Sequence, residues 1–212
     1  MSEEQRLWIP CESIRLDGAL WLPEVKGLAP GVVLCHPHPL NGGNMHSDVV
    51  LGIRNALVAR GLAVLRFNFR GVGRSEGEHG EGVEELDDVR AALSVLAAVP
   101  AVDSADLSVV GYSFGAWVGL RAASGDPRAR RLVAVAPPLT MCAMDELFAS
   151  NKPKLAVVGS RDEFCPAEQF ETWFGRLAEP KLKAVVQGAD HFFWGREGEV
   201  GDAVAGYLAQ RP

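Results

Sequence analysis

The sequence lacks any apolar run long enough to cross a bilayer, and residues 1–5 contain no basic region leading into an apolar run. The first absence argues against a membrane-spanning helix, and the second against a secretory signal peptide. Positive charge is also in deficit, with 21 Lys and Arg against 27 Asp and Glu. Because nucleic acids and anionic membranes attract basic surfaces, we expect neither as a partner. The missing signal peptide leads us to expect a cytoplasmic protein.

Paired cysteines are missing as well. The four cysteines, Cys11, Cys35, Cys142 and Cys165, form no Cys-x-x-Cys pair. Free thiols in a reducing compartment explain this spacing better than disulfides or a zinc site. We therefore expect no metal and no cofactor.

What is present is a chain of 212 residues, 48% of them hydrophobic, without internal repeats or a low-complexity linker. This length and composition predict one domain over residues 1–212 with a large core. Apolar β-rich runs alternate with helical patterns, which predicts a mainly parallel sheet covered by helices on both faces. The predicted strands are 31–35, 62–69, 106–111, 132–136, 154–159 and 181–186, and the predicted helices are 47–60, a helix ending near 98, 114–123, 166–177 and 197–209.

The segments around these elements carry further expectations. Residues 7–12 and 13–22 alternate as two antiparallel strands, with Asp17-Gly18 as the hairpin turn. The acidic stretch from Glu76 to Asp88 is interpreted as the solvated first turn of a helix, where negative charge complements the helix dipole. His79, within this stretch, and His46, well before it, are both expected at the surface.

The clearest chemical motif is Gly-Tyr-Ser-Phe-Gly at residues 111–115, which lies between a predicted strand and a predicted helix. A serine at such a corner occupies strained backbone and presents its hydroxyl clear of the sheet. Asp162, His191 and the loop of residues 36–41 follow the ends of other predicted strands. Since ligands bind at the carboxyl ends of parallel strands, we expect these groups to meet at one edge.

These motifs resemble the α/β-hydrolase superfamily over nearly the whole chain. The resemblance rests on residues 111–115, 159–162 and 188–192, and more narrowly on residues 35–43 and 67–77. The narrower segments are similar to small, capless bacterial hydrolases related to dienelactone hydrolases and short-chain esterases. Dienelactone hydrolases carry a cysteine at the centre of the Gly-x-x-x-Gly turn, where this chain has Ser113. The resemblance implies an α/β-hydrolase fold without a large cap domain.

The chemistry and the resemblance together assign three catalytic roles. Ser113 is the expected nucleophile, His191 the base that takes its proton, and Asp162 the acid that orients the imidazole. Glu163 is a weaker alternative acid. Asp190 is expected to shape its turn, because a neighbour of the histidine rarely reaches back to its ring.

Two backbone amides are expected to stabilise the oxyanion. Phe114 supplies the first, because it follows the nucleophile. Pro37 and Pro39 have no N–H, so His38, Leu40 or Asn41 must supply the second. We favour His38, by analogy with the His-Gly-x loop of related hydrolases, with Leu40 as the alternative. Structural roles are expected for the side chains of His36 and His38.

The expected substrate is a small molecule. Residues 137–152 are too few for a helical cap, so the site should be open. The apolar residues of this stretch could belong to the core, but we expect at least some to form a lip over Ser113. The expected apolar pocket consists of Leu40, Met141, Met144 and Phe192, with Phe193 and Trp194 near the histidine. This predicts a carboxylesterase acting on small apolar esters, with thioesters as a further class. Acyl transfer, lactone opening, peptide cleavage and a non-catalytic binding role are the alternatives, since fold does not fix substrate. The sequence leaves the oligomeric state open.

Overall fold

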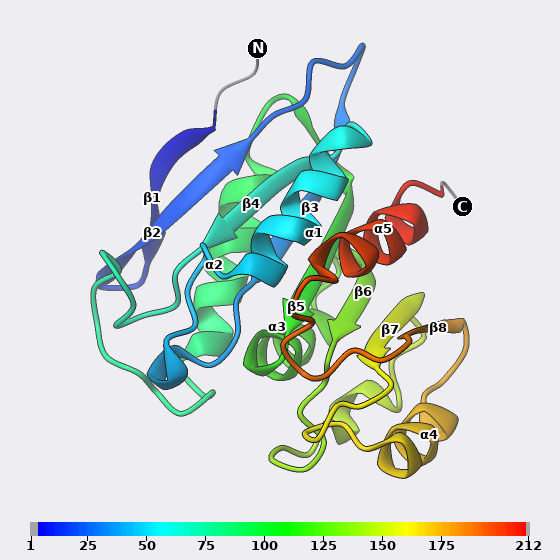
Figure 1. Cartoon of the computed structure of the whole chain (residues 1–212). Helices are drawn as coiled ribbons and strands as arrows, with labels where there is room; N and C mark the ends of the chain where they lie inside the picture. The colour runs from blue at the N-terminus through cyan, green and yellow to red at the C-terminus, as the bar shows by residue number, and fades with distance from the viewer. Residues whose placement is uncertain (1–3, 211–212) are drawn as a thin grey trace.

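A single eight-stranded sheet runs through the middle of the computed structural model, which describes residues 4–210 (Figure 1). The strand order is β1-β2-β4-β3-β5-β6-β7-β8, and the six strands from β4 to β8 along the sheet are parallel to one another. The strands are β1 (Gln5–Cys11), β2 (Ile14–Trp21), β3 (Ala29–Cys35), β4 (Ala63–Phe67), β5 (Val102–Tyr112), β6 (Ala129–Val135), β7 (Lys154–Gly159) and β8 (Lys181–Val186).

The register of the two central strands positions the site. In β3 and β5, Val33 pairs with Val109 and Leu34 with Val110, so that Cys35 lies beside Gly111 at the carboxyl ends. These valine and leucine side chains are buried on both faces, as the continuous apolar runs predict. The loop after β3 and the turn after β5 therefore emerge side by side.

Within the described residues, five α-helices cover the sheet in two layers (Figure 1). They are α1 (Asp48–Ala59), α2 (Glu85–Ala97), α3 (Phe114–Ser124), α4 (Ala167–Arg176) and α5 (Glu197–Leu208). Buried residues of α1 and α5 form one core with the sheet, and those of α2, α3 and α4 form the other. In the part of the chain that the structure describes, no helix has the length and apolar character needed to cross a membrane.

Close backbone contact locks α1 against α5. A β-carbon at Gly201 would lie 2.6 Å from the carbonyl oxygen of Gly52, and one at Gly52 would lie 2.8 Å from the carbonyl oxygen of Glu197. Only glycine permits such an approach. The predicted mainly parallel sheet with helices on both faces is confirmed, and β7 and β8 have the predicted bounds.

The N-terminal hairpin differs from the prediction in the position of its turn. Cys11 pairs with Ile14, which places the turn at Glu12 and Ser13, with Glu12 at a φ of 51°. Asp17 and Gly18 lie inside β2, so the prediction of a turn there is wrong. Asp17 is instead buried and well bonded, because its carboxylate accepts hydrogen bonds from Arg6 and its backbone amide donates to the hydroxyl oxygen of Ser75.

The acidic stretch is also less solvated than expected. Glu85 and Asp88, in the first turn of α2, are fully buried. Asp88 accepts hydrogen bonds from the amide and guanidinium of Arg70, and Glu85 accepts the amides of Gly80 and Gly82. A buried carboxylate needs such partners, and the helix N-terminus adds favourable dipoles.

Candidate active site

The turn between β5 and α3 holds Ser113 in strained backbone, with a φ of 53° and a ψ of −117°. A β-carbon at Gly111 would lie 2.1 Å from the carbonyl oxygen of Gly115, and one at Gly115 would lie 2.4 Å from that of Cys35. The Ser113 amide donates to Val135 of β6 at 2.9 Å. The two glycines and this bond fix the serine at the edge of the sheet.

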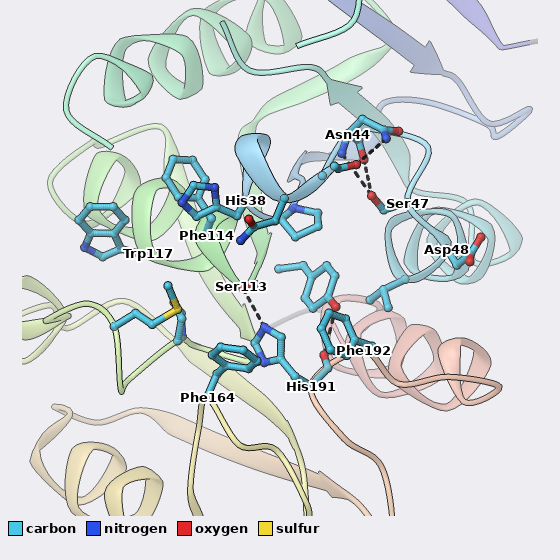
Figure 2. A pocket seen from close by; sticks show the side chains of 18 of the residues that line it. His38, Asn44, Ser47, Asp48, Ser113, Phe114, Trp117, Phe164, His191 and Phe192 are labelled. Atoms are coloured by element: carbon cyan, nitrogen blue, oxygen red, sulfur yellow. Dashed lines mark hydrogen bonds between the residues drawn. The ribbon is translucent and has the colours of Figure 1, made fainter. Parts of the chain in front are cut away.

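The structure brings Ser113, His191 and Asp162 into one hydrogen-bonded chain, and Figure 2 shows the contact between Ser113 and His191. His191 Nε2 lies 2.9 Å from Ser113 Oγ, and its Nδ1 lies 2.9 Å and 3.0 Å from the two Asp162 oxygens. All three side chains are nearly buried, with Ser113 8% exposed. This is the geometry in which an imidazole can take the proton of a serine hydroxyl.

Two backbone amides also bind the Asp162 carboxylate. Its Oδ1 accepts the amides of Phe164 at 2.9 Å and Cys165 at 3.0 Å. Glu163 is exposed, which leaves it outside the chain of hydrogen bonds. Asp190 accepts the amides of Phe192 and Phe193, so it shapes its own turn as predicted.

Two aromatic residues that the sequence did not single out position His191. The Tyr112 hydroxyl donates to the His191 carbonyl at 3.0 Å, and the Phe164 ring lies 4.6 Å from the imidazole. Tyr112 ends β5 directly before Ser113, and Phe164 follows β7 two residues after Asp162. Their positions next to predicted site residues are the signal that could have identified them. Burial raises the pKa of Tyr112 well above its ordinary value, so the hydroxyl stays a donor at neutral pH.

The backbone amides around Ser113 differ in whether they are free to donate. Leu40 N–H donates to His38 Nδ1 at 3.2 Å, and Asn41 N–H donates to the His38 carbonyl at 3.1 Å. The amides of His38 and Phe114 donate to no acceptor within residues 4–210. Of the three loop amides considered, His38 is therefore the one available to a ligand.

A cavity of about 650 Å³ opens over Ser113 (Figure 2). Met141 and Phe192 line it, as predicted. Met144 does not, because it precedes a 3₁₀ turn (Asp145–Leu147) packed on α3 and is only 1% exposed in the core. Leu40 is 72% exposed and lies outside the lining, since the short turn over residues 39–41 directs it to solvent. Trp194, expected near the histidine, also lines the cavity. The lining residues that the sequence missed include Asn44, Trp117, Pro138, Cys142 and Phe164.

His36 supports the loop from below. Its Nε2 accepts the Phe69 amide at 3.0 Å, and its Nδ1 lies 2.6 Å from the Pro37 carbonyl oxygen, which fits a neutral ring protonated at Nδ1. The side chain is fully buried, and burial lowers its pKa to about 4. The structural role expected for His36 agrees with these contacts.

This burial predicts an acid-sensitive fold. The unfolded chain takes up a proton at His36 below its ordinary pKa of 6.5, whereas the folded chain does so only near 4. Stability is therefore lost as pH falls through this window, by about 3 kcal/mol. Urea unfolding at about pH 7 and about pH 4 should show that His36→Gln loses less stability than wild type. Equal losses in the two proteins would contradict the assignment.

The remaining histidines divide between the surface and the site. His46 is exposed, as expected. His79 is only 12% exposed and packs beside His38 and Phe114, so its predicted surface position is wrong. Within residues 4–210, no three His, Cys, Asp or Glu side chains gather in an arrangement that could hold a metal ion.

Comparison with known proteins places this geometry in a family. Residues 31–156 match the family model described as "Serine aminopeptidase, S33". An uncharacterised protein of Rickettsia prowazekii is 34% identical over 188 residues, which cover 85% of this chain and 79% of that protein. A thiohydrolase of Arthrinium phaeospermum is 30% identical over 129 residues, covering 59% of this chain and 40% of that protein.

Solved structures agree with the sequence matches. A serine hydrolase homologue from Coxiella burnetii has a TM-score of 0.88 and 33% identity, with 98% of each chain covered. A lidless serine hydrolase from Xanthomonas campestris has a TM-score of 0.85 and 30% identity, covering 100% of this chain and 98% of that one. The family model spans more than half of this chain, and both structures match nearly all of it. The chain therefore belongs to the α/β-hydrolase superfamily, among the serine hydrolases without a large cap.

Proposed function

We propose that this hydrolase is a carboxylesterase that cleaves small apolar esters through an acyl-enzyme on Ser113. The observation that carries the proposal is the unbroken chain from Ser113 through His191 to Asp162, opening on a largely apolar cavity. A serine hydroxyl is a poor nucleophile unless a base removes its proton, and here the base lies 2.9 Å away.

In the first half of the reaction, Ser113 Oγ attacks the ester carbonyl carbon as its proton passes to His191 Nε2. Asp162 stabilises the imidazolium and fixes its orientation. The negative charge that develops on the carbonyl oxygen is stabilised by the amides of Phe114 and His38. These donors are already in place, so they need little reorganisation during the reaction.

In the second half, the tetrahedral intermediate collapses and His191 gives its proton to the departing alcohol. Water then enters, loses a proton to His191 and attacks the acyl group on Ser113. The carboxylic acid leaves, and the serine hydroxyl recovers its proton from His191. Phe164 and Phe192, on either side of the imidazole, limit the water that reaches it (Figure 2).

The cavity lining supports an uncharged substrate. Pro138, Met141, Phe164 and Phe192 supply apolar surface near Ser113. Asp48, in the first turn of α1, is the one carboxylate of the described residues that lines the cavity. An aminopeptidase must bind the charged amine of its substrate. A mostly apolar lining with a single carboxylate therefore favours esters over peptides with a free N-terminus as substrates. The thiohydrolase relative supports thioesters as a second class.

A substrate panel tests the proposal. We expect p-nitrophenyl acetate and butyrate to give the highest kcat/KM, a butyryl thioester to follow, and aminoacyl p-nitroanilides to give none. Ser113→Ala serves as the blank for each substrate. Ester turnover equal to this blank would refute the proposal, and a preference for the anilides would replace it with peptidase activity. The cytoplasmic location and the lack of nucleic-acid and membrane partners stay predictions from composition.

A further inference from the structure

Three rings pack together beside Ser113. The His38 ring lies 5.0 Å from that of Phe114, and the His79 ring lies 5.4 Å from His38 and 5.6 Å from Phe114. The first two rings belong to the residues whose amides are free to bind an oxyanion. His79 comes from the loop before α2 and contacts the side chains of both.

A buried carboxylate holds this loop. Glu85 is fully buried at the start of α2, and its two oxygens accept the amides of Gly80 at 2.7 Å and Gly82 at 2.8 Å. His79 Nδ1 lies 2.8 Å from Glu85 Oε1, although the ring is not aligned for a straight hydrogen bond. The Glu85 carboxylate thus binds the loop at two amides, and the His79 ring in the same loop lies beside the site.

The same loop is also pressed against α3. A β-carbon at Gly82 would lie 2.2 Å from the Trp117 ring, and the Gly82 carbonyl accepts a hydrogen bond from Arg121 at 3.4 Å. Glu81 and Gly82 both have positive φ values, of 53° and 83°. A strained turn persists only when its surroundings hold it, which indicates a rigid rather than a freely moving loop.

The His38 ring is itself fixed in one state. Its Nδ1 accepts the Leu40 amide, so the proton of the neutral ring is on Nε2. Burial and the neighbouring His79 hold the pKa of His38 below its ordinary value, so Nδ1 stays unprotonated and can accept the Leu40 amide. Loss of His79 would leave His38 and Phe114 without a shared ring contact on that side.

We propose that His79, which lies beside the buried Glu85, is a positioning residue that fixes His38 and Phe114 so that their amides point at the developing oxyanion. This inference rests on the proposed esterase function. The proposal rests on the contacts of the His79 ring with the rings of His38 and Phe114. Moving an oxyanion donor by a fraction of an ångström weakens transition-state stabilisation much more than it weakens substrate binding.

The first test separates kcat from KM. His79→Ala should lower kcat for p-nitrophenyl butyrate about tenfold, less than the loss of a whole donor, with KM within about twofold of wild type. His79→Phe keeps a ring in place and should restore most of the kcat. Val83→Ala, an exposed change in the same loop, is the matched control and should match wild type. His79→Phe as impaired as His79→Ala, or His79→Ala as active as wild type, would overturn the inference.

A second readout depends on the oxyanion itself. A thionoester places sulfur where the carbonyl oxygen of the ester lies, and sulfur is a weak acceptor of hydrogen bonds. If His79 acts through the donors, the ratio of ester to thionoester kcat falls about fivefold in His79→Ala and stays constant in Val83→Ala. A general loss of structure would lower kcat equally for the ester and the thionoester, and this result would overturn the inference. Wild type without ester turnover would refute the proposed function as well, whereas active wild type with a constant ratio refutes this inference alone.

Discussion

Replacing Ser113 with alanine should lower kcat for p-nitrophenyl butyrate by about 10⁶-fold, to the rate left by binding and the oxyanion donors. The variant loses the attacking oxygen, and no second hydroxyl lies within hydrogen-bond distance of His191 Nε2 among the described residues. The fold should be little affected, because the Ser113 side chain makes no hydrogen bond other than that to His191 in this part of the chain. Initial rates and thermal unfolding of the same samples measure both effects.

Ser47 provides a matched control for this prediction. It is the other serine that lines the cavity, but its hydroxyl bonds only to Asn44 in the described residues. Ser47→Ala should cost less than about tenfold in kcat, since no bond to the reacting atoms is lost. A Ser113→Ala variant that keeps a tenth of wild-type activity would mean that another residue attacks the ester.

Asp162→Asn is expected to lower kcat about 10⁴-fold while leaving the protein folded. The amides of Phe164 and Cys165 both donate to Oδ1, so the carbonyl oxygen of the asparagine takes that position. Its NH₂ group then faces His191 Nδ1 and donates to it. The imidazole proton is driven onto Nε2, which can no longer accept the proton of Ser113.

Glu163→Gln is the control for this second prediction, because Glu163 is adjacent, acidic and exposed. It should keep kcat within about twofold of wild type, as exposed charges contribute little at this range. Steady-state kinetics of both variants, with circular dichroism to check folding, measure the difference. A large loss in Glu163→Gln with little loss in Asp162→Asn would transfer the role of the acid to Glu163.

The parts of the site that the sequence predicted are those set by local sterics and by strand order. Gly111 and Gly115 are required wherever a strand turns into a helix this tightly, so the motif alone indicates where Ser113 lies. Asp162 and His191 follow strands whose carboxyl ends must share one edge in a parallel sheet. Their meeting with Ser113 needed no knowledge of side-chain packing.

The parts that the sequence did not predict depend on packing between distant segments. Met144 and Met141 look alike in the sequence, yet only contact with α3 decides that Met144 is buried and Met141 lines the cavity. Asp17-Gly18 has the composition of a turn, but pairing of β2 with β1 and β4 keeps it in a strand. The burial of Glu85 and the position of His79 likewise arise from the fold around α2 and α3.

The most direct test of the activated serine is labelling with a fluorophosphonate probe, with the modified residue located by mass spectrometry. The geometry predicts a single adduct on Ser113 in wild type, no adduct in Ser113→Ala, and much slower labelling in His191→Ala, because the probe reacts with a hydroxyl that a base has activated. A folded wild-type protein that takes no label, or labels equally fast without His191, would contradict the account.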